Sequence, residues 1–138
     1  AGSAVLVDAG ALIALLDRSD AHHAAAVAAL DRIREPLLTV WPALTEAMHL
    51  VSGVPRAPRA LLDLVDEGGV ELAELDRDDV ARIGELMDKY ADLPMDFADA
   101  ALVRAAERHV TSKILTFDRH FEVYRLGRRQ RFTIIRAR

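Results

Sequence analysis

The sequence predicts an α/β domain with a mainly parallel sheet of five strands. Five short, largely apolar runs alternate with segments in which apolar residues recur at helical spacing, and this alternation is typical of βαβ units. The chain has 138 residues, of which 51% are hydrophobic, which suits a single domain with a sizeable core and argues against disorder. Crossovers in such folds are right-handed, and sites lie beyond the carboxyl ends of the strands.

The composition excludes several classes of protein. The chain has no cysteine, which removes disulfides, thiolate catalysis and cysteine-ligated zinc, and which fits a cytoplasmic protein. No apolar run approaches the roughly 18 residues of a membrane span and no signal peptide is visible, so we expect no membrane association. Residues 1–3, Ala-Gly-Ser without a methionine, resemble a cloning remnant, and we expect one domain over residues 4–138.

The strands are predicted from short runs bounded by prolines, glycines or charged residues. Four of these runs are mainly apolar, as in strands that are buried on both faces, whereas VELAEL alternates. The expected strands are residues 4–7, 37–40, 70–75, 113–116 and 132–135.

The helices are predicted from apolar periodicity together with their capping residues. Asp20 and Asp76 are placed to N-cap two helices, Pro42 and Pro58 to open two more, and Gly68-Gly69 to end one. The expected helices are residues 9–16, 22–34, a segment opened by Pro42, 58–66, 76–90, 96–110 and a short helix from residue 118. The second would bury Ala26, Val27, Leu30 and Ile33, and the helix over 76–90 would bury Val80, Ile83 and Met87.

Charge is distributed unevenly along the chain. The net charge is −4, yet residues 119–138 hold seven arginines against one acidic residue, whereas residues 1–118 hold 11 basic and 21 acidic residues. This asymmetry is typical of an acidic site beside a basic rim, and Arg119, Arg128 and Arg129 are candidates for contacts with nucleic-acid phosphates. The competing interpretation is an acidic domain with an arginine-rich tail.

Five acidic residues stand near the predicted carboxyl edge of the sheet. Asp8 and Asp118 follow two of the strands. Asp96 and Asp99 are three residues apart, so they share one face of a helix's first turn, and Glu46 lies in an apolar helical segment. Taken singly, the aspartates have an ordinary interpretation as helix caps, and Glu46 as a solvated helix residue. Taken together, they predict that the carboxylates meet.

Converging carboxylates point to a divalent cation. They repel one another and raise one another's pKa unless a cation lies among them. Hard oxygen ligands select Mg²⁺ or Mn²⁺, ions that keep bound waters and engage phosphate. Such an ion can activate a water for attack on a phosphodiester, so no residue need act as a covalent nucleophile.

At this point the sequence resembles the PIN domains, and within them the VapC-type toxins of bacterial VapBC toxin–antitoxin pairs. The residues that carry the resemblance are VLVDAGALIALLD, LTEAMHL, PMDFADAALVRAAERHV and ILTFDRHF, in the family's order over nearly the whole chain. The resemblance implies a three-layer α/β/α sandwich and a Mg²⁺- or Mn²⁺-dependent endoribonuclease acting on tRNA or rRNA. It also implies a homodimer, inhibited by a VapB-type antitoxin.

The family's acidic residues carry over motif by motif. Asp8, Glu46, Asp99 and Asp118 match the four acids of the catalytic metal site, and Asp96 is a further acid found in a subset. Many relatives follow the first aspartate with a hydroxyl residue, where this chain has Ala9, so one hydrogen bond to the ligand is in doubt. Thr116 is placed to hydrogen-bond a carboxylate or a metal-bound water.

Two other functions compete with this interpretation. A phosphoacceptor receiver domain is also doubly wound, but it needs an acidic pair after the first strand and a lysine after the last, and Arg136 follows FTII here. The second alternative is a binding module that keeps the fold without turnover. A dimer is expected independently, because ALIALL and AAAVAAL carry more small apolar residues than a small domain exposes.

Overall fold

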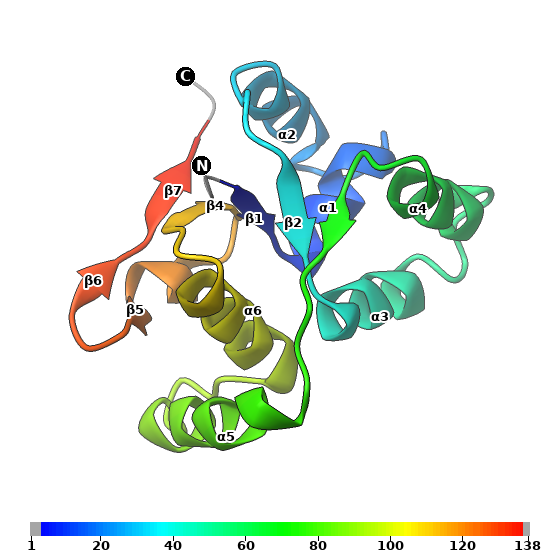
Figure 1. Cartoon of the computed structure of the whole chain (residues 1–138). Helices are drawn as coiled ribbons and strands as arrows, with labels where there is room; N and C mark the ends of the chain where they lie inside the picture. The colour runs from blue at the N-terminus through cyan, green and yellow to red at the C-terminus, as the bar shows by residue number, and fades with distance from the viewer. Residues whose placement is uncertain (1–3, 137–138) are drawn as a thin grey trace.

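The computed structural model describes residues 4–136, so the predicted cloning remnant and Arg138 lie outside the described residues. Its centre is one sheet of five parallel strands in the order β3-β2-β1-β4-β7 (Figure 1). The strands are β1 (Val5–Val7), β2 (Leu37–Thr39), β3 (Glu71–Leu72), β4 (Lys113–Leu115) and β7 (Thr133–Ile135). The predicted parallel five-stranded sheet is confirmed.

Helices cover both faces of the sheet and give the three expected layers. They are α1 (Ala9–Leu16), α2 (His23–Leu30), α3 (Trp41–Leu50), α4 (Ala57–Asp66), α5 (Val80–Lys89) and α6 (Phe97–Arg108). Successive side chains of a strand point to opposite faces, so Val5 and Val7 pack in the core with α1, α2 and α4, whereas Leu6 packs with α5 and α6. Helix α3 contributes Ala43 to one core and Leu44 to the other.

Helix α2 differs from its prediction. It begins at His23 after a turn in which the carboxylate of Asp20 accepts the amide of His22, and it ends at Leu30. The predicted cap by Asp20 and the extension to residue 34 are therefore wrong. The predicted core face is wrong in part, since Val27 and Leu30 are exposed and the core contacts come from Ala26 and Ala29. An alanine-rich helix leaves this face undecided, because several faces are equally apolar.

The other helices and strands depart from prediction in smaller ways. Val80, predicted to be buried, is exposed because the helix starts with a 3-10 turn, η1 (Arg77–Asp79), that Asp76 caps. The chain also forms an unpredicted hairpin, β5 (Arg125–Leu126) with β6 (Gln130–Arg131). Gly127 turns it at φ +56°, a left-handed conformation that favours glycine. Two-residue strands carry too little periodicity to be recognised in a sequence.

Helix α6 is fixed against its neighbours by small residues and by ion pairs. Seven of its residues are buried and five of these are alanines, which allows close packing on the sheet and α3. Arg104 and Arg108 hold the buried carboxylate of Asp79 at 2.7 and 2.6 Å, and Glu107 accepts hydrogen bonds from Arg82 and from the amide of Gly127. A buried carboxylate is stable only when it is paired in this way. These contacts hold α6, and with it Asp99, in one position.

None of the helices within residues 4–136 combines the length and apolar character needed to cross a membrane.

Candidate metal centre

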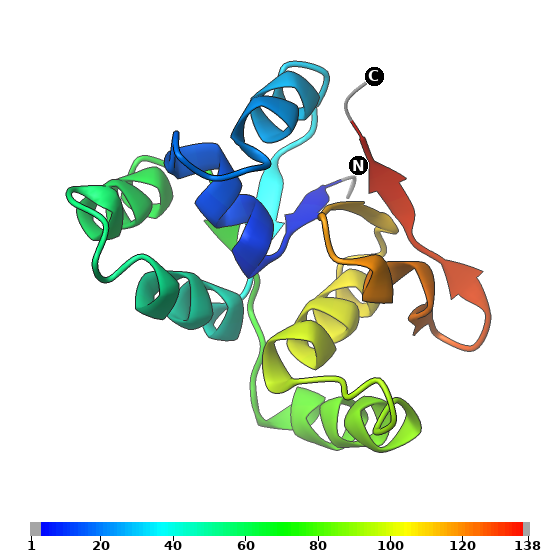
Figure 2. The same cartoon turned by 180° about the vertical axis from the view of Figure 1, so that it is seen from behind.

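The five acidic residues singled out in the sequence line one cavity of about 310 Å³ at the carboxyl edge of the sheet. Figure 2 shows why they converge: the starts of α1 and α6 lie near the carboxyl ends of β1 and β4, with α3 alongside. The carboxylates in the cavity are those of Asp8, Glu46, Asp96, Asp99 and Asp118. Each follows a strand or lies in or at the start of a helix, as the parallel topology requires.

Asp8 is the deepest of these groups, and both of its oxygens are held by hydrogen bonds. Its side chain is the N-cap of α1 and accepts the amide of Ala11 at 2.9 Å, while the hydroxyl of Thr116 donates to the second oxygen. Thr116 also accepts the amide of Asp118 at 3.0 Å, so one hydroxyl links the two acidic positions. Thr116 thus supplies a hydroxyl hydrogen bond to Asp8, which the side chain of Ala9 cannot make.

Asp96 and Asp99 occupy the start of α6. The carboxylate of Asp96 is the N-cap and accepts the backbone amide of Asp99 at 2.9 Å. This hydrogen bond does not use the side chain of Asp99. The hydroxyl of Tyr124 donates to Asp99 at 2.9 Å, and Tyr124 is itself fixed by edge-to-face contacts with Tyr90 and Phe121 at 5.1 Å each. The orientation of Asp99 therefore depends on an aromatic cluster that follows β4.

The charge of Asp118 repels three other carboxylates of the cavity, those of Asp8, Glu46 and Asp99. Burial raises the pKa of Asp8 to about 6, and Asp118 and Glu46 add repulsion. Burial raises the pKa of Asp99 to about 7, with repulsion from Asp96, Asp118 and Asp8. The pKa of the exposed Glu46 is also raised, by partial burial and by Asp96 and Asp118. The carboxylates are thus close enough to disfavour one another's charge, and each would be relieved by a cation.

One further candidate ligand was missed in the sequence. Ligand atoms of Asp99, Asp118 and His120 lie within 4.8 Å of one another, and this is the only such group found within residues 4–136. His120 belongs to a 3-10 turn, η2 (Arg119–Glu122), whose N-cap is Asp118. The sequence signal was the spacing DRH, in which Asp118 and His120 are two residues apart on a tight turn.

The candidate RNA-binding arginines lie in two different places. Arg119 is next to Asp118 and lines a hollow that adjoins the acidic cavity. Arg128 and Arg129 lie in the β5–β6 turn, which binds the C-terminal end of α6, whereas Asp96 and Asp99 lie at the other end. A helix of 12 residues is about 18 Å long. Arg128 and Arg129 therefore lie away from the acidic cavity, and RNA binding by them stays a prediction.

Residues 5–126 match the family model of the PIN domain. The chain belongs to the PIN-domain family. This PIN domain is 33% identical over 135 residues to Ribonuclease VapC26 of Mycobacterium tuberculosis (strain ATCC 25618 / H37Rv). The aligned residues cover 95% of this chain and 99% of that protein.

Solved structures share the fold of this PIN domain. Mycobacterium tuberculosis VapC20, a sarcin-ricin loop cleaving toxin, superposes with a TM-score of 0.83 at 19% identity, covering 96% of this chain and 98% of that one. VapBC2 from Rickettsia felis, bound to a DNA fragment from its promoter, superposes with a TM-score of 0.68 at 11% identity and the same coverage. At these identities the superpositions show the fold alone.

The fold rules out the receiver-domain alternative. In the PIN domain the first strand of the chain is central and the sheet runs β3-β2-β1-β4-β7. A receiver domain has its second strand at one edge, in the order 2-1-3-4-5. Asp8 is accordingly part of a cavity built from β1, β4, α3 and α6, and not the phosphorylation site of a receiver domain.

We expect Asp99→Asn to stabilise the metal-free PIN domain at neutral pH but not at pH 4. The pKa of Asp99 is about 7 in the folded protein against 3.8 as its ordinary value, so the folded state binds more protons between these values. The free energy of unfolding therefore falls as pH rises through this window. Asparagine keeps an acceptor for Tyr124 without the charge, and the gain above pH 7 should be on the order of 2–4 kcal/mol.

Urea unfolding in a chelating buffer from pH 4 to pH 8 measures this difference. Asp88→Asn, which removes an exposed carboxylate of α5, is the control and should follow the wild type. If the free energy of unfolding changed with pH in the same way for the wild type and for Asp99→Asn, the pKa of Asp99 would not be raised in the folded state, and the prediction would be wrong.

Proposed function

We propose that this PIN domain is a Mg²⁺- or Mn²⁺-dependent endoribonuclease and the toxin of a type II toxin–antitoxin pair. The observation that carries the proposal is the single cavity in which five carboxylates meet and in which the pKa values of Asp8, Glu46 and Asp99 are raised. Such a cavity is unfavourable without a cation, and the donor set is the one that hard divalent ions prefer. The 33% identity to a ribonuclease over nearly the full chain supports RNA as the substrate.

The residues of the cavity divide into two groups by depth. Asp8 and Asp99, held by Thr116 and Tyr124, would form the fixed side of the metal site, to which Asp118 adds a more exposed carboxylate. Glu46 and Asp96 are exposed and lie where a substrate phosphate and its waters would enter. A divalent ion bound here supplies an activated water and neutralises charge on the scissile phosphate. The protein's own part is to orient these oxygens before the substrate arrives.

We expect Asp8→Asn and Asp99→Asn to lose cleavage of a structured RNA by roughly a hundredfold or more in Mg²⁺ or Mn²⁺. Asparagine keeps the size and one acceptor oxygen but removes the charge that holds the ion. The measurement is single-turnover cleavage of tRNA and rRNA fragments, with chelator as a second way to remove the metal. Full activity of Asp99→Asn, or of the wild type in chelator, would leave the non-catalytic binding module as the better account.

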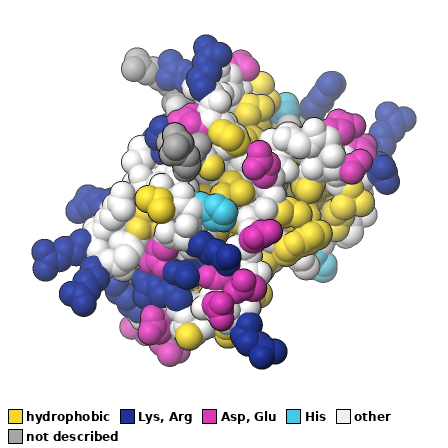
Figure 3. All heavy atoms as spheres, viewed as in Figure 1, with side chains coloured by type: hydrophobic (Ala, Val, Ile, Leu, Met, Phe, Trp, Pro, Cys, Tyr) yellow, Lys and Arg dark blue, Asp and Glu magenta, His cyan; other side chains and the backbone are white. Residues whose placement is uncertain are grey.

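Arginine variants serve as the contrast in the same assay. Arg119→Ala, beside the cavity, should weaken RNA binding and flatten its dependence on salt, because fewer phosphate contacts release fewer counterions. The double variant Arg128→Ala/Arg129→Ala should do the same only for RNA long enough to reach the β5–β6 turn. Figure 3 shows Lys and Arg side chains gathered at the left edge, where this hairpin lies in Figure 1. Cleavage at saturating RNA should persist in both.

We further propose that the protein acts in the cytoplasm and is neutralised there by a VapB-type antitoxin. The resemblance of its motifs to VapC-type toxins supports this partner. A ribonuclease that acts on tRNA or rRNA must be held inactive until it is needed, and a protein that covers the acidic cavity would do so.

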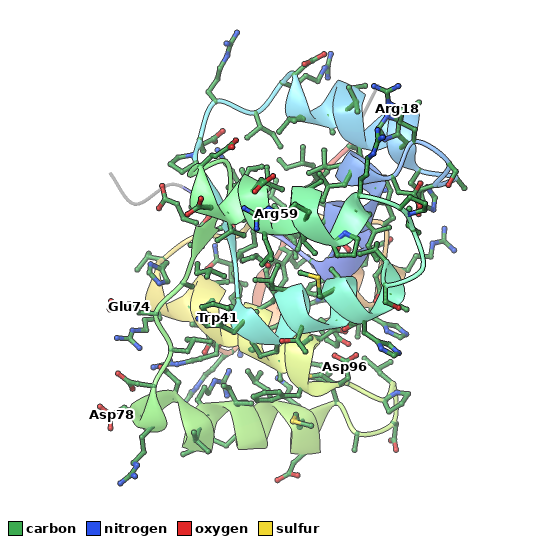
Figure 4. All side chains as sticks on the ribbon, turned by 90° about the vertical axis from the view of Figure 1, so that its right-hand side faces the viewer. Arg18, Trp41, Arg59, Glu74, Asp78 and Asp96 are labelled. Carbon is green, nitrogen blue, oxygen red and sulfur yellow. The ribbon has the colours of Figure 1, made fainter. Side chains whose placement is uncertain are left out.

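A homodimer is supported by one of the two predicted apolar segments and by a further surface. Helix α1 is largely covered, so its segment ALIALL does not supply an exposed apolar face, whereas AAAVAAL in α2 exposes Val27 and Leu30. Exposed apolar side chains also line a groove of about 680 Å³, which we call the Trp41 groove. Its exposed apolar members are Trp41, Val80 and Phe97. Figure 4 views this side of the molecule, with Trp41 labelled at the start of α3 and Asp96 at the start of α6.

The Trp41 groove continues toward the acidic cavity. A second hollow is lined by Trp41 and Phe97 together with Glu46 and Asp96, so the apolar surface and the acidic cavity share a border. Apolar patches of this kind are typical of protein interfaces, and a two-fold dimer is the commonest way to cover one. Pairing along the groove would bring two acidic cavities near each other.

We expect Val80→Lys to shift the protein from dimer to monomer, because a lysine at the centre of an apolar interface must be desolvated. Light scattering at tens of micromolar protein measures the mass. Val110→Lys is the matched control: Val110 is 85% exposed but lies beyond the other end of α6, so its replacement should leave the dimer intact. A monomeric wild type would contradict the proposal.

A further inference from the structure

His120 is the one imidazole of the chain that shares a tight group of ligand atoms with the acidic residues described above. Its ligand atom and those of Asp99 and Asp118 lie within 4.8 Å of one another. Its Nδ1 is 3.5 Å from a carboxylate oxygen of Asp118. We propose that His120 binds the same ion, which makes this a mixed imidazole–carboxylate centre that prefers Mn²⁺ to Mg²⁺. This inference rests on the metal site of the proposed function.

Two of the other histidines have ring contacts of their own. A ring nitrogen of His23 is 2.7 Å from the carbonyl of Ala14, and His22 stacks on Phe117 at 4.4 Å. The Nε2 atom of His109 is buried without a hydrogen-bond partner within residues 4–136, and His109 lies at the C-terminal end of α6, away from the acidic cavity. By contrast, no hydrogen bond of the ring of His120 is found within residues 4–136, and the side chain is 42% exposed. Its ring nitrogens are therefore available to a ligand.

The backbone of His120 is fixed although its ring is not. The amide of His120 donates to Asp118 at 2.9 Å, and its carbonyl accepts the amides of Val123 and Tyr124. Tyr124, at the end of this turn, donates to Asp99. One short segment therefore places Asp118, presents the ring of His120 and orients Asp99. A side chain on a fixed backbone loses little freedom when it binds an ion.

The chemical consequence follows from ligand type. Carboxylates and water bind Mg²⁺ and Mn²⁺ alike, whereas an imidazole nitrogen favours transition ions and contributes little to Mg²⁺. Asp118, the acidic residue that repels most of the others, is the one next to His120. A neutral nitrogen donor beside it adds a ligand without adding a negative charge.

Electron spin echo measurements on the Mn²⁺-loaded protein test this assignment. A nitrogen bound to Mn²⁺ produces a ¹⁴N modulation, which carboxylates and waters do not. We expect the modulation in the wild type and in His22→Asn, and its loss in His120→Asn. His22 is a demanding control because it lines the acidic cavity itself. Titrations should show Mn²⁺ affinity falling roughly tenfold in His120→Asn while Mg²⁺ affinity changes much less.

The outcomes separate the two proposals. Tight Mn²⁺ binding by the wild type without ¹⁴N modulation would overturn the role of His120 and leave the carboxylate site standing. Modulation that survives in His120→Asn but vanishes in His22→Asn would overturn it as well. Failure of the wild type to bind Mn²⁺ or Mg²⁺ would remove the metal site itself. A melting temperature of His120→Asn close to that of the wild type confirms that the variant folds; if it does not fold, the spectrum of His120→Gln decides.

Discussion

The burial of mutually repelling carboxylates is the constraint on which the functional end of this protein depends. Five acidic side chains, those of Asp8, Glu46, Asp96, Asp99 and Asp118, line a cavity of about 310 Å³. Burial and proximity raise the pKa of Asp8 to about 6 and that of Asp99 to about 7. Such an arrangement opposes folding, so the rest of the structure must hold it in place.

The fold holds the carboxylates by contacts that serve local structure as well. Asp8, Asp96 and Asp118 each cap a helix or turn, which gives their oxygens backbone amide partners. Thr116 and Tyr124 add hydroxyl donors to Asp8 and Asp99. Capping and site formation are therefore not competing interpretations of these residues. The same hydrogen bond that starts a helix also fixes the direction in which a carboxylate points.

The far end of α6 contributes through rigidity. The ion pairs of Asp79 with Arg104 and Arg108, and those of Glu107 with Arg82, tie α6 to α5 and to the hairpin. Because α6 is one helix, its position at Arg108 determines its position at Phe97. Removing both arginines would leave Asp79 charged, buried and unpaired, which costs several kcal/mol. The basic residues of this region thus include structural cations as well as candidates for RNA contact.

Local sequence patterns were sufficient for much of the fold and for the acidic residues. The strands are apolar runs, and the acids follow strands or lie in helical segments, so parallel topology alone brings them to one edge. Long-range contacts were not predictable in this way. Tyr124 reaches Asp99 across 25 residues, and the ring of His120 approaches Asp99 only because η2 is a tight turn. The Trp41 groove also combines residues from separate segments, α3, α5 and α6.

The most direct test of the central claim is the number of protons released when the metal-free protein binds Mn²⁺. Calorimetric titration in two buffers of different ionisation enthalpy measures this number. Since Asp99 and Asp8 have pKa values of about 7 and about 6, binding at pH 6.5 should release about one proton, and at pH 8.5 almost none. Mn²⁺ binding with no proton release at pH 6.5 would show that the carboxylates are already ionised, and it would contradict the account.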